Sequence, residues 1–190
     1  MSEEIKIIFT GDFIPPNKTD SQIYSDELLK LLKDKDFSIT NLETPLTDSN
    51  VSITKTGRNF KRSPSSIKFI KEGHFDAVCL SNNHIRDYDD QGVVDTIDTC
   101  HKNNIKTVGA GKNLSEAKLP LHLNIKGKQI SILNYSEKEF NIADNGKAGA
   151  NPFDLIDAYN DVKREREKND YVIVVYHGGL EYHHIPYPYI

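Results

Sequence analysis

The stretch from Ala77 to Asp87 places the strongest constraint on how this chain can fold. It begins as a short apolar run, Ala-Val-Cys-Leu, and changes abruptly into Ser81, two asparagines, His84 and finally Asp87. The apolar part has the length and composition of a buried strand, whereas the polar part would lose hydration in a core without gaining partners. Open α/β sheets bind their ligands beyond the carboxyl ends of their strands. The stretch therefore predicts an α/β domain with a site at that edge of the sheet.

The rest of the chain alternates strand-like and helix-like segments, as α/β proteins do. β-rich runs occupy residues 5–10, 37–40, 75–80, 105–108 and 171–176, and helical patterns occupy 22–33, 64–73, 92–103 and a segment that opens at 151–154. Residues 121–125 and 129–134 alternate around Lys126-Gly127, which predicts an antiparallel hairpin added to the parallel pattern. The continuous apolar run at 171–176 predicts a strand covered on both faces. Residues 46–62 are polar and predict a long loop.

Length and composition exclude several classes of protein. The 190 residues suit a single domain, 1–190, with a core of its own. The net charge of -4 offers no general attraction to nucleic acid or anionic lipid, so we expect neither partner. Cys79 and Cys100 lack metal-ligand spacing and predict packing roles in a reducing compartment. No run is long enough to span a membrane and no leader pattern precedes the first strand, so we expect a cytoplasmic location.

Four of the strand-like runs end in residues that can bind a cation. In chain order these residues are Asp12; Asn41 and Glu43; Asn83, His84 and Asp87; and His177 and Glu181. Carboxylate, amide oxygen and imidazole together are the ligand set of harder and borderline divalent metals. Two carboxylates held close together repel one another, and a cation relieves that repulsion. The four strand ends together therefore predict a metal site.

Each of these motifs also has a purely structural interpretation. Asp12 after a glycine is typical of a turn, Asn41 and Glu43 suit a cap and a surface acid, and the polar side chains before and at His84 could bond the backbone of their own loop. His177 is the hardest to explain in this way, because burying an imidazole at the end of an apolar strand without a partner is costly. The coincidence of four such ends favours a functional site.

The order and spacing of these motifs resemble those of the CapA-type proteins of poly-gamma-glutamate capsule synthesis, the PGA_cap family, a branch of the calcineurin-like metallophosphoesterases. The matching motifs are Gly11-Asp12, the segment 41–47, Ser81–His84 with Asp87, Gly109–Gly111 with Glu116-Ala117, and the segment 177–182. The resemblance runs through nearly the whole chain. It implies a metallophosphoesterase-like α/β sandwich with mixed sheets and one or two divalent metal ions, most often Mn, Fe or Zn, at the strand ends.

The resemblance also implies roles for individual residues. The positions that match metal ligands are Asp12, Glu43, Asn83 and His177. His84 matches the histidine that acts as general acid or transition-state donor. Asn41, Asp87 and Glu181 match positions that line the substrate pocket or support the ligands.

This chain departs from the family pattern in two places. The family usually has a glycine soon after the position of Asp87, whereas here Tyr88 is followed by Asp89 and Asp90, and glycine comes only at position 92. The family pattern also continues into a further Gly-His-x-x-His-like segment, which is not present in these 190 residues. The resemblance therefore leads us to expect a domain that lacks its C-terminal portion.

Three functions are compatible with these motifs. The first is a divalent-metal-dependent phosphoesterase-like hydrolase of capsule or cell-envelope polymer metabolism, which acts on a phosphorylated or anionic polymer-related substrate. The second is a non-catalytic accessory protein for the assembly or transport of an anionic capsule polymer. The third is a hydrolase of peptide or amide bonds in polyglutamate that uses the same metal centre.

Overall fold

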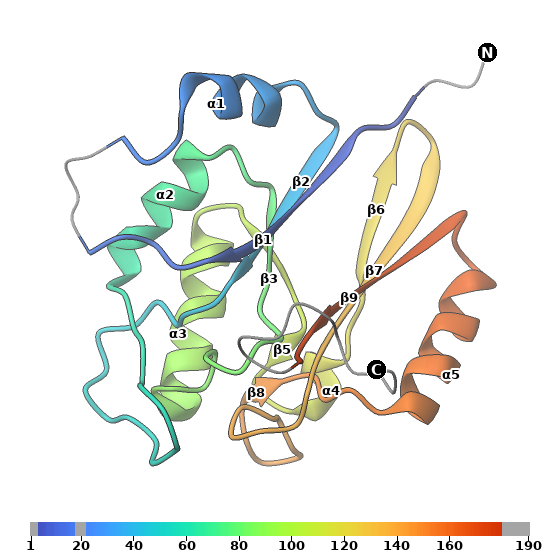
Figure 1. Cartoon of the computed structure of the whole chain (residues 1–190). Helices are drawn as coiled ribbons and strands as arrows, with labels where there is room; N and C mark the ends of the chain where they lie inside the picture. Colours follow the sequence, from blue (N-terminus) through green and yellow to red (C-terminus); the bar gives the residue numbers. More distant parts are fainter. Residues whose placement is uncertain (1–3, 18–21, 180–190) are drawn as a thin grey trace.

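The structure, a computed structural model, describes residues 4–17 and 22–179 and contains three sheets flanked by helices (Figure 1). Its strands are β1 (Ile7–Phe13), β2 (Phe37–Leu42), β3 (Ala77–Cys79), β4 (Lys106–Val108), β5 (Ala110–Gly111), β6 (Leu121–Ile125), β7 (Lys128–Ser136), β8 (Gly149–Ala150) and β9 (Tyr171–His177). Its helices are α1 (Asp26–Lys33), the short 3-10 helix η1 (Pro64–Ser66), α2 (Ile67–Glu72), α3 (Asp89–Lys102), α4 (Leu114–Ala117) and α5 (Leu155–Arg166). None of these helices has the length and apolarity that a membrane crossing requires.

The first sheet is entirely parallel and has the strand order β1-β2-β3-β4. Because each strand is added on the same side of its predecessor, right-handed crossovers place all the connecting helices on one face. Figure 1 shows α1, α2 and α3 together on that face. Their apolar residues pack against the sheet in one buried cluster, which includes Leu32, Ile70, Val93, Cys100 and Val78. The opposite face of the sheet is left for other elements.

The second sheet has the order β6-β7-β9 and mixes both strand orientations. β6 and β7 form the antiparallel hairpin that the sequence predicts, and Lys126 and Gly127 at its turn have φ of 50° and 78°, as a type I′ turn requires. β9 then pairs in parallel with β7 after the α5 crossover. α5 covers the outer face of this sheet, where Tyr135 packs against Ala158.

The two sheets pack face to face and form the centre of a sandwich. Side chains from both sheets make one apolar cluster, in which the fully or nearly buried members are Phe37, Ile39, Ala77, Cys79, Val108, Leu123, Ile130 and Ile132. The third sheet, β5-β8, is a two-residue antiparallel pair beside α4.

The α/β class, the mixed sheets and the hairpin are thus as the sequence predicts. Cys79 and Cys100 are both buried and unbridged, in agreement with packing roles.

The prediction that residues 171–176 form a strand covered on both faces holds only in part. Val174 is 46% exposed and Tyr171 is 54% exposed. Within the described strands β9 pairs with β7 alone, so it lies at the edge of its sheet, where α5 packs on only part of the outer face. Ile173 and Val175 pack inside the sandwich, and Val172 and Tyr176 pack on the side of α5, so each face of β9 is covered in part.

Some helix starts also differ from the sequence-based expectation. α3 begins at Asp89, three residues before the expected start, and Asp89 has φ of 55°. Aspartate tolerates this left-handed conformation better than most residues other than glycine, which explains how the chain makes this turn without the family's glycine. α5 begins after Asp154, whose side chain accepts from the backbone N–H groups of Ile156 and Asp157. Ser63 makes no side-chain capping bond to the short helix that follows it.

Candidate metal centre

A bulge in β1 brings Asp12 to the candidate site. Residues Ile7 to Phe9 of β1 pair with β2 in regular register. After Phe9 the register shifts by one extra residue on β1, so that Asp12 lies opposite Asn41. Such bulges re-aim the side chains that follow them. The Asn41 amide donates to Asp12 Oδ1 at 2.6 Å. Asp12 is therefore part of β1 rather than the turn after it, and its carboxylate is held by the neighbouring strand.

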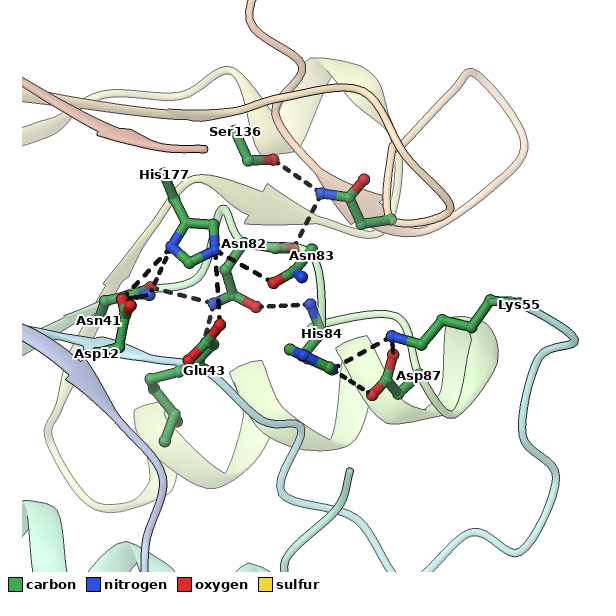
Figure 2. Close-up of polar contacts among 12 residues, drawn as sticks. Asp12, Asn41, Glu43, Lys55, Asn82, Asn83, His84, Asp87, Ser136 and His177 are labelled. Carbon is green, nitrogen blue, oxygen red and sulfur yellow. Dashed lines mark hydrogen bonds and ion pairs between the residues drawn. The ribbon is translucent and has the colours of Figure 1, made fainter. Parts of the chain in front are cut away.

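Asp12, Glu43 and His177 converge from three strand ends onto one point. Their ligand atoms all lie within 4.8 Å of one another. His177 Nδ1 is 3.4 Å from Asp12 Oδ1, and its Nε2 is 3.6 Å from Glu43 Oε1. Figure 2 shows the imidazole between the two carboxylates. Asp12 lies near the end of β1 and Glu43 directly follows β2, both in the first sheet, whereas His177 ends β9 of the second, so the site spans the sandwich.

Two amides complete this cluster. Asn83 Oδ1 lies 3.1 Å from His177 Nε2, and Asn41 Nδ2 lies 3.2 Å from His177 Nδ1. The structure thus brings together all four residues that match metal ligands, Asp12, Glu43, Asn83 and His177, with Asn41 among them. Glu181 lies outside the described residues. Two carboxylates, an amide oxygen and an imidazole fit a borderline divalent cation.

Buried polar residues hold the loops of the site in place. Asn82 is fully buried, donates to Asn41 Oδ1 and to the Leu42 carbonyl, and accepts from the His84 backbone N–H at 3.1 Å. The carbonyl of Asn82 in turn accepts from the Asn141 amide at 2.9 Å. Asn82 therefore ties the end of β2 to the loop after β3.

The glycine motif after β4 has a packing role beside this loop. Gly109 has φ of +90°, and a Cβ at that position would lie 2.1 Å from Asn134 Oδ1. The same Asn134 oxygen accepts from the Ser81 backbone N–H at 2.8 Å. Glycine is needed here because the backbone must come this close to Asn134. The motif thus positions the start of the loop that carries Asn83 and His84.

The electrostatics of the cluster favour a bound cation. Burial lowers the pKa of His177, but the hydrogen bond to Asp12 and the charges of Asp12 and Glu43 outweigh it, so the pKa is raised. The pKa of Asp12 is lowered, chiefly by its hydrogen bond with His177. The raised pKa favours the protonated imidazole beside the two acids. Because a metal binds the neutral imidazole, a divalent cation would displace this proton and take over the same role.

His84 and Asp87 form a second group next to the four converging residues. His84 Nδ1 lies 2.7 Å from Asp87 Oδ2, and the Asp87 side chain is fully buried. Lys55, from the loop at 46–62, forms an ion pair with the other carboxylate oxygen. The ring of Phe60 packs on that of His84 with centroids 4.6 Å apart. Asp87 therefore contacts His84 rather than the His177 cluster.

Sequence reasoning missed Lys55, Phe60 and Asn82 as residues of the site. Lys55 and Phe60 lie in a polar loop with no strand or helix pattern, so nothing in their sequence context pointed to the site. Asn82 stands directly before the Asn-His pair, but its partners, Asn41 and Leu42, are 40 residues or more away. Phe60 is the only aromatic residue of the loop at 46–62, which is the one signal that its sequence offers.

Comparison with known proteins assigns the chain to a family. Residues 6–190 match the sequence model described as "Bacterial capsule synthesis protein PGA_cap". The chain belongs to the PGA_cap family. It is 30% identical over 166 residues to the capsule biosynthesis protein CapA of Bacillus anthracis, and 29% identical over 163 residues to the PGA biosynthesis protein CapA of Bacillus subtilis (strain 168). These matches cover 83% and 82% of the chain, but only 40% and 42% of the two relatives.

Solved structures confirm the fold of this PGA_cap protein. A phosphatase from Mycoplasma pneumoniae superposes with a TM-score of 0.50 and 18% identity, over 95% of this chain and 57% of the phosphatase. A protein described as a putative 5'-nucleotidase from Staphylococcus aureus superposes with a TM-score of 0.51 and 14% identity, over 93% of this chain and 38% of that one. The fold is the metallophosphoesterase-like α/β sandwich that the motifs predicted. The PGA_cap chain spans about half the length, or less, of the proteins it matches.

Proposed function

We propose that this PGA_cap chain binds one or two divalent metal ions and hydrolyses phosphate esters in capsule or cell-envelope polymer metabolism. The observation that carries the proposal is the convergence of two carboxylates, an amide and an imidazole at one end of the sandwich. The two acids lie close enough to repel one another, and the double charge of a divalent cation would offset that repulsion more fully than the imidazole of His177. The likeness to a phosphatase fold supports the hydrolytic chemistry.

In this proposal the metal is held by Asp12, Glu43, Asn83 and His177. When bound, such a metal supplies stabilisation of the charge that develops on a phosphoryl group and activation of water. The chain itself supplies a proton donor. His84 has one ring nitrogen engaged with Asp87 and the other turned away from it, on the side of Glu43 (Figure 2). His84 would donate a proton to the departing oxygen, a step that contributes about 10²–10⁴-fold to a rate.

The test is hydrolysis of an aryl phosphate ester by the purified chain supplied with Mn²⁺, Fe²⁺ or Zn²⁺. We expect metal-dependent turnover that Asp12→Asn abolishes and that His84→Ala lowers by about 10-fold on such an activated ester. Asp157→Asn is the matched control, because Asp157 is an exposed carboxylate on α5 that pairs with Lys118. A metal-loaded chain with no more turnover than Asp12→Asn would overturn the proposal.

The family assignment favours a second candidate of a different class. The matched relatives are described as capsule or PGA biosynthesis proteins, which is a role in building a polymer rather than cleaving one. In this alternative the chain binds an anionic capsule polymer during assembly or transport and performs no chemistry. Binding to poly-gamma-glutamate that survives His84→Ala, in a chain without turnover on phosphate or amide substrates, would support it.

A further inference from the structure

The loop at 46–62 is fastened to one buried carboxylate. Phe60 donates its backbone N–H to Asp87 Oδ2 at 2.7 Å, and Lys55 forms an ion pair with Asp87 Oδ1. The backbone N–H of Ile53 donates to the Asp87 carbonyl at 3.0 Å. The side chains of Lys55 and Asp87 are only 4% and 0% exposed. A lysine is rarely buried to this extent unless it is paired, so this contact calls for a specific explanation.

The contacts around Asp87 define which ring nitrogen of His84 carries a proton. His84 Nδ1 lies 2.7 Å from Asp87 Oδ2 and 3.2 Å from Lys55 Nζ. An ammonium group can only donate and a carboxylate can only accept. One Nδ1 atom cannot donate to the carboxylate and accept from the ammonium at once. The shorter contact, at 2.7 Å to Asp87 Oδ2, decides its role, so Nδ1 donates to Asp87, and the ammonium of Lys55 is held by Asp87 Oδ1. The imidazolium form carries a second proton on Nε2; transfer of that proton to the leaving oxygen leaves the neutral Nδ1–H imidazole bonded to Asp87. Figure 2 shows Nε2 on the side of the ring away from Asp87.

We propose that Lys55 is a positioning residue that fixes the orientation and tautomer of His84 through Asp87. The ammonium group occupies Oδ1 and neutralises the buried carboxylate, which leaves Oδ2 to receive the His84 and Phe60 N–H groups. The Phe60 ring, packed on the imidazole, restricts rotation of His84 in the same arrangement. This inference rests on the proposed function, in which His84 donates a proton to the leaving oxygen.

Lys55 forms no ion pair or hydrogen bond with the four converging residues; its charged partner is Asp87. Its removal should therefore leave metal binding intact and change only how His84 is held. Lys61 lies in the same loop and bonds Ser49 and Asn50 instead, with its ammonium over the ring of Tyr88. Lys61→Met is therefore the matched control for a general loosening of the loop.

The first experiment measures kcat for phosphate monoesters whose leaving groups range from nitrophenol to simple alcohols, in metal-loaded wild-type, Lys55→Met, His84→Ala and Lys61→Met proteins. A proton donor matters most for a poor leaving group. For both Lys55→Met and His84→Ala we expect losses that grow along the series, from about 10-fold with nitrophenyl ester to about 10²-fold or more with alkyl esters. Lys61→Met should show no such trend, and metal content should be equal in all four. Equal losses of Lys55→Met on every ester would overturn the proposal.

The second experiment does not depend on turnover. Nitrogen-15 NMR of the imidazole in wild-type protein should show Nδ1 of His84 protonated, and Lys55→Met should convert it to a mixture of ring tautomers. If wild-type protein hydrolyses no ester, the proposed function fails while this spectrum still tests Lys55. An unchanged spectrum in Lys55→Met would overturn the positioning role. If Lys55→Met does not fold, Asp87→Asn, which keeps the shape of the carboxylate but not its charge, should produce the same mixture.

Discussion

This molecule contains two clusters of acids and histidines, and the protein neutralises them differently. The first is the metal-centre cluster, Asp12, Glu43, Asn83 and His177. The second, here called the α5 cluster, lies between α5 and β6-β7 and consists of His122, Ser131, Tyr135, Asp161, Arg164 and Glu165. Both contain two carboxylates and one histidine. Only the α5 cluster contains an arginine.

The α5 cluster is satisfied by the protein itself. Glu165 Oε2 contacts His122 at 2.6 Å and accepts from Ser131 at 3.0 Å. Arg164 pairs with Asp161 at 2.8 Å and approaches Glu165 at 3.6 Å. Since arginine stays charged at any ordinary pH, these acids are permanently compensated. In the metal-centre cluster the compensating group is His177, and under the proposed function a metal ion would take over this role.

The largest expected effect comes from removing a carboxylate of the metal-centre cluster. In Asp12→Asn we expect metal affinity to fall by more than the ~10–100-fold that the loss of a ligand's supporting partner costs. Elemental analysis and metal titration measure this. Asp161→Asn, the equivalent change in the α5 cluster, should leave metal affinity unaltered. If Asp12→Asn and Asp161→Asn lowered metal affinity equally, the two clusters would not differ in metal binding.

Removing a carboxylate of the α5 cluster should act on stability instead. Glu165→Gln loses charge-assisted bonds to His122 and Arg164, so we expect the free energy of unfolding to fall by about 2 kcal/mol. Urea denaturation of the metal-free protein measures the change. Glu43→Gln should lower the stability of the metal-free protein less than Glu165→Gln does, because the loss of its contact with His177 is partly offset by the relief of repulsion with Asp12. A greater loss in Glu43→Gln than in Glu165→Gln would contradict the comparison.

The two clusters should also respond to pH in opposite directions. Burial alone would raise the pKa of Glu165, but hydrogen bonds from His122 and Ser131 outweigh it and lower the pKa. The stabilisation is therefore present above the ordinary glutamate pKa and is lost as pH falls through the lowered one. The pKa of His177 is raised, so its stabilisation is present below the ordinary value of 6.5 and is lost as pH rises through the folded-state value.

Urea denaturation across a pH series separates these two contributions in the metal-free protein. Glu165→Gln should reduce the loss of stability at acid pH, and His177→Ala should remove the loss near and above neutral pH. Saturating metal should offset the loss near neutral pH, because it replaces the proton of His177. A His177→Ala profile that matches wild type above pH 6.5 would show that His177 has no such role.

The smallest expected effect is at the edge of the α5 cluster. The Tyr135 hydroxyl donates to Asp161 Oδ2 at 3.0 Å, and Asp161 keeps Arg164 when this bond is removed. Tyr135→Phe should therefore lower the free energy of unfolding by only about 1 kcal/mol, without changing metal affinity. Tyr159→Phe, on the exposed side of α5, is the control and should have no measurable effect. If Tyr135→Phe lowered the free energy of unfolding more than Glu165→Gln does, the tyrosine hydrogen bond would be the main stabilising contact of the α5 cluster.

The sequence predicted those parts of the molecule that depend on short stretches of chain. The apolar run before Asn83 and the one before His177 marked strands, and parallel strands bring their carboxyl ends to one edge, so the converging residues could be named before their contacts were known. Lys55 could not be named from the sequence, because its partner Asp87 is 32 residues away and the loop has no periodic pattern that shows which way the lysine points. The exposure of Val174 was also missed, since the same apolar run fits an edge strand or a central one.

The candidate site joins the two halves of the sandwich, since His177 comes from β9 and the other converging residues come from the first sheet. A cation bound by all of them would link the two sheets directly. Opening that end of the molecule would then require breaking coordination bonds as well as separating apolar surfaces. The supply of metal would thus control how often β9 detaches from the body of the domain, in addition to its part in the chemistry.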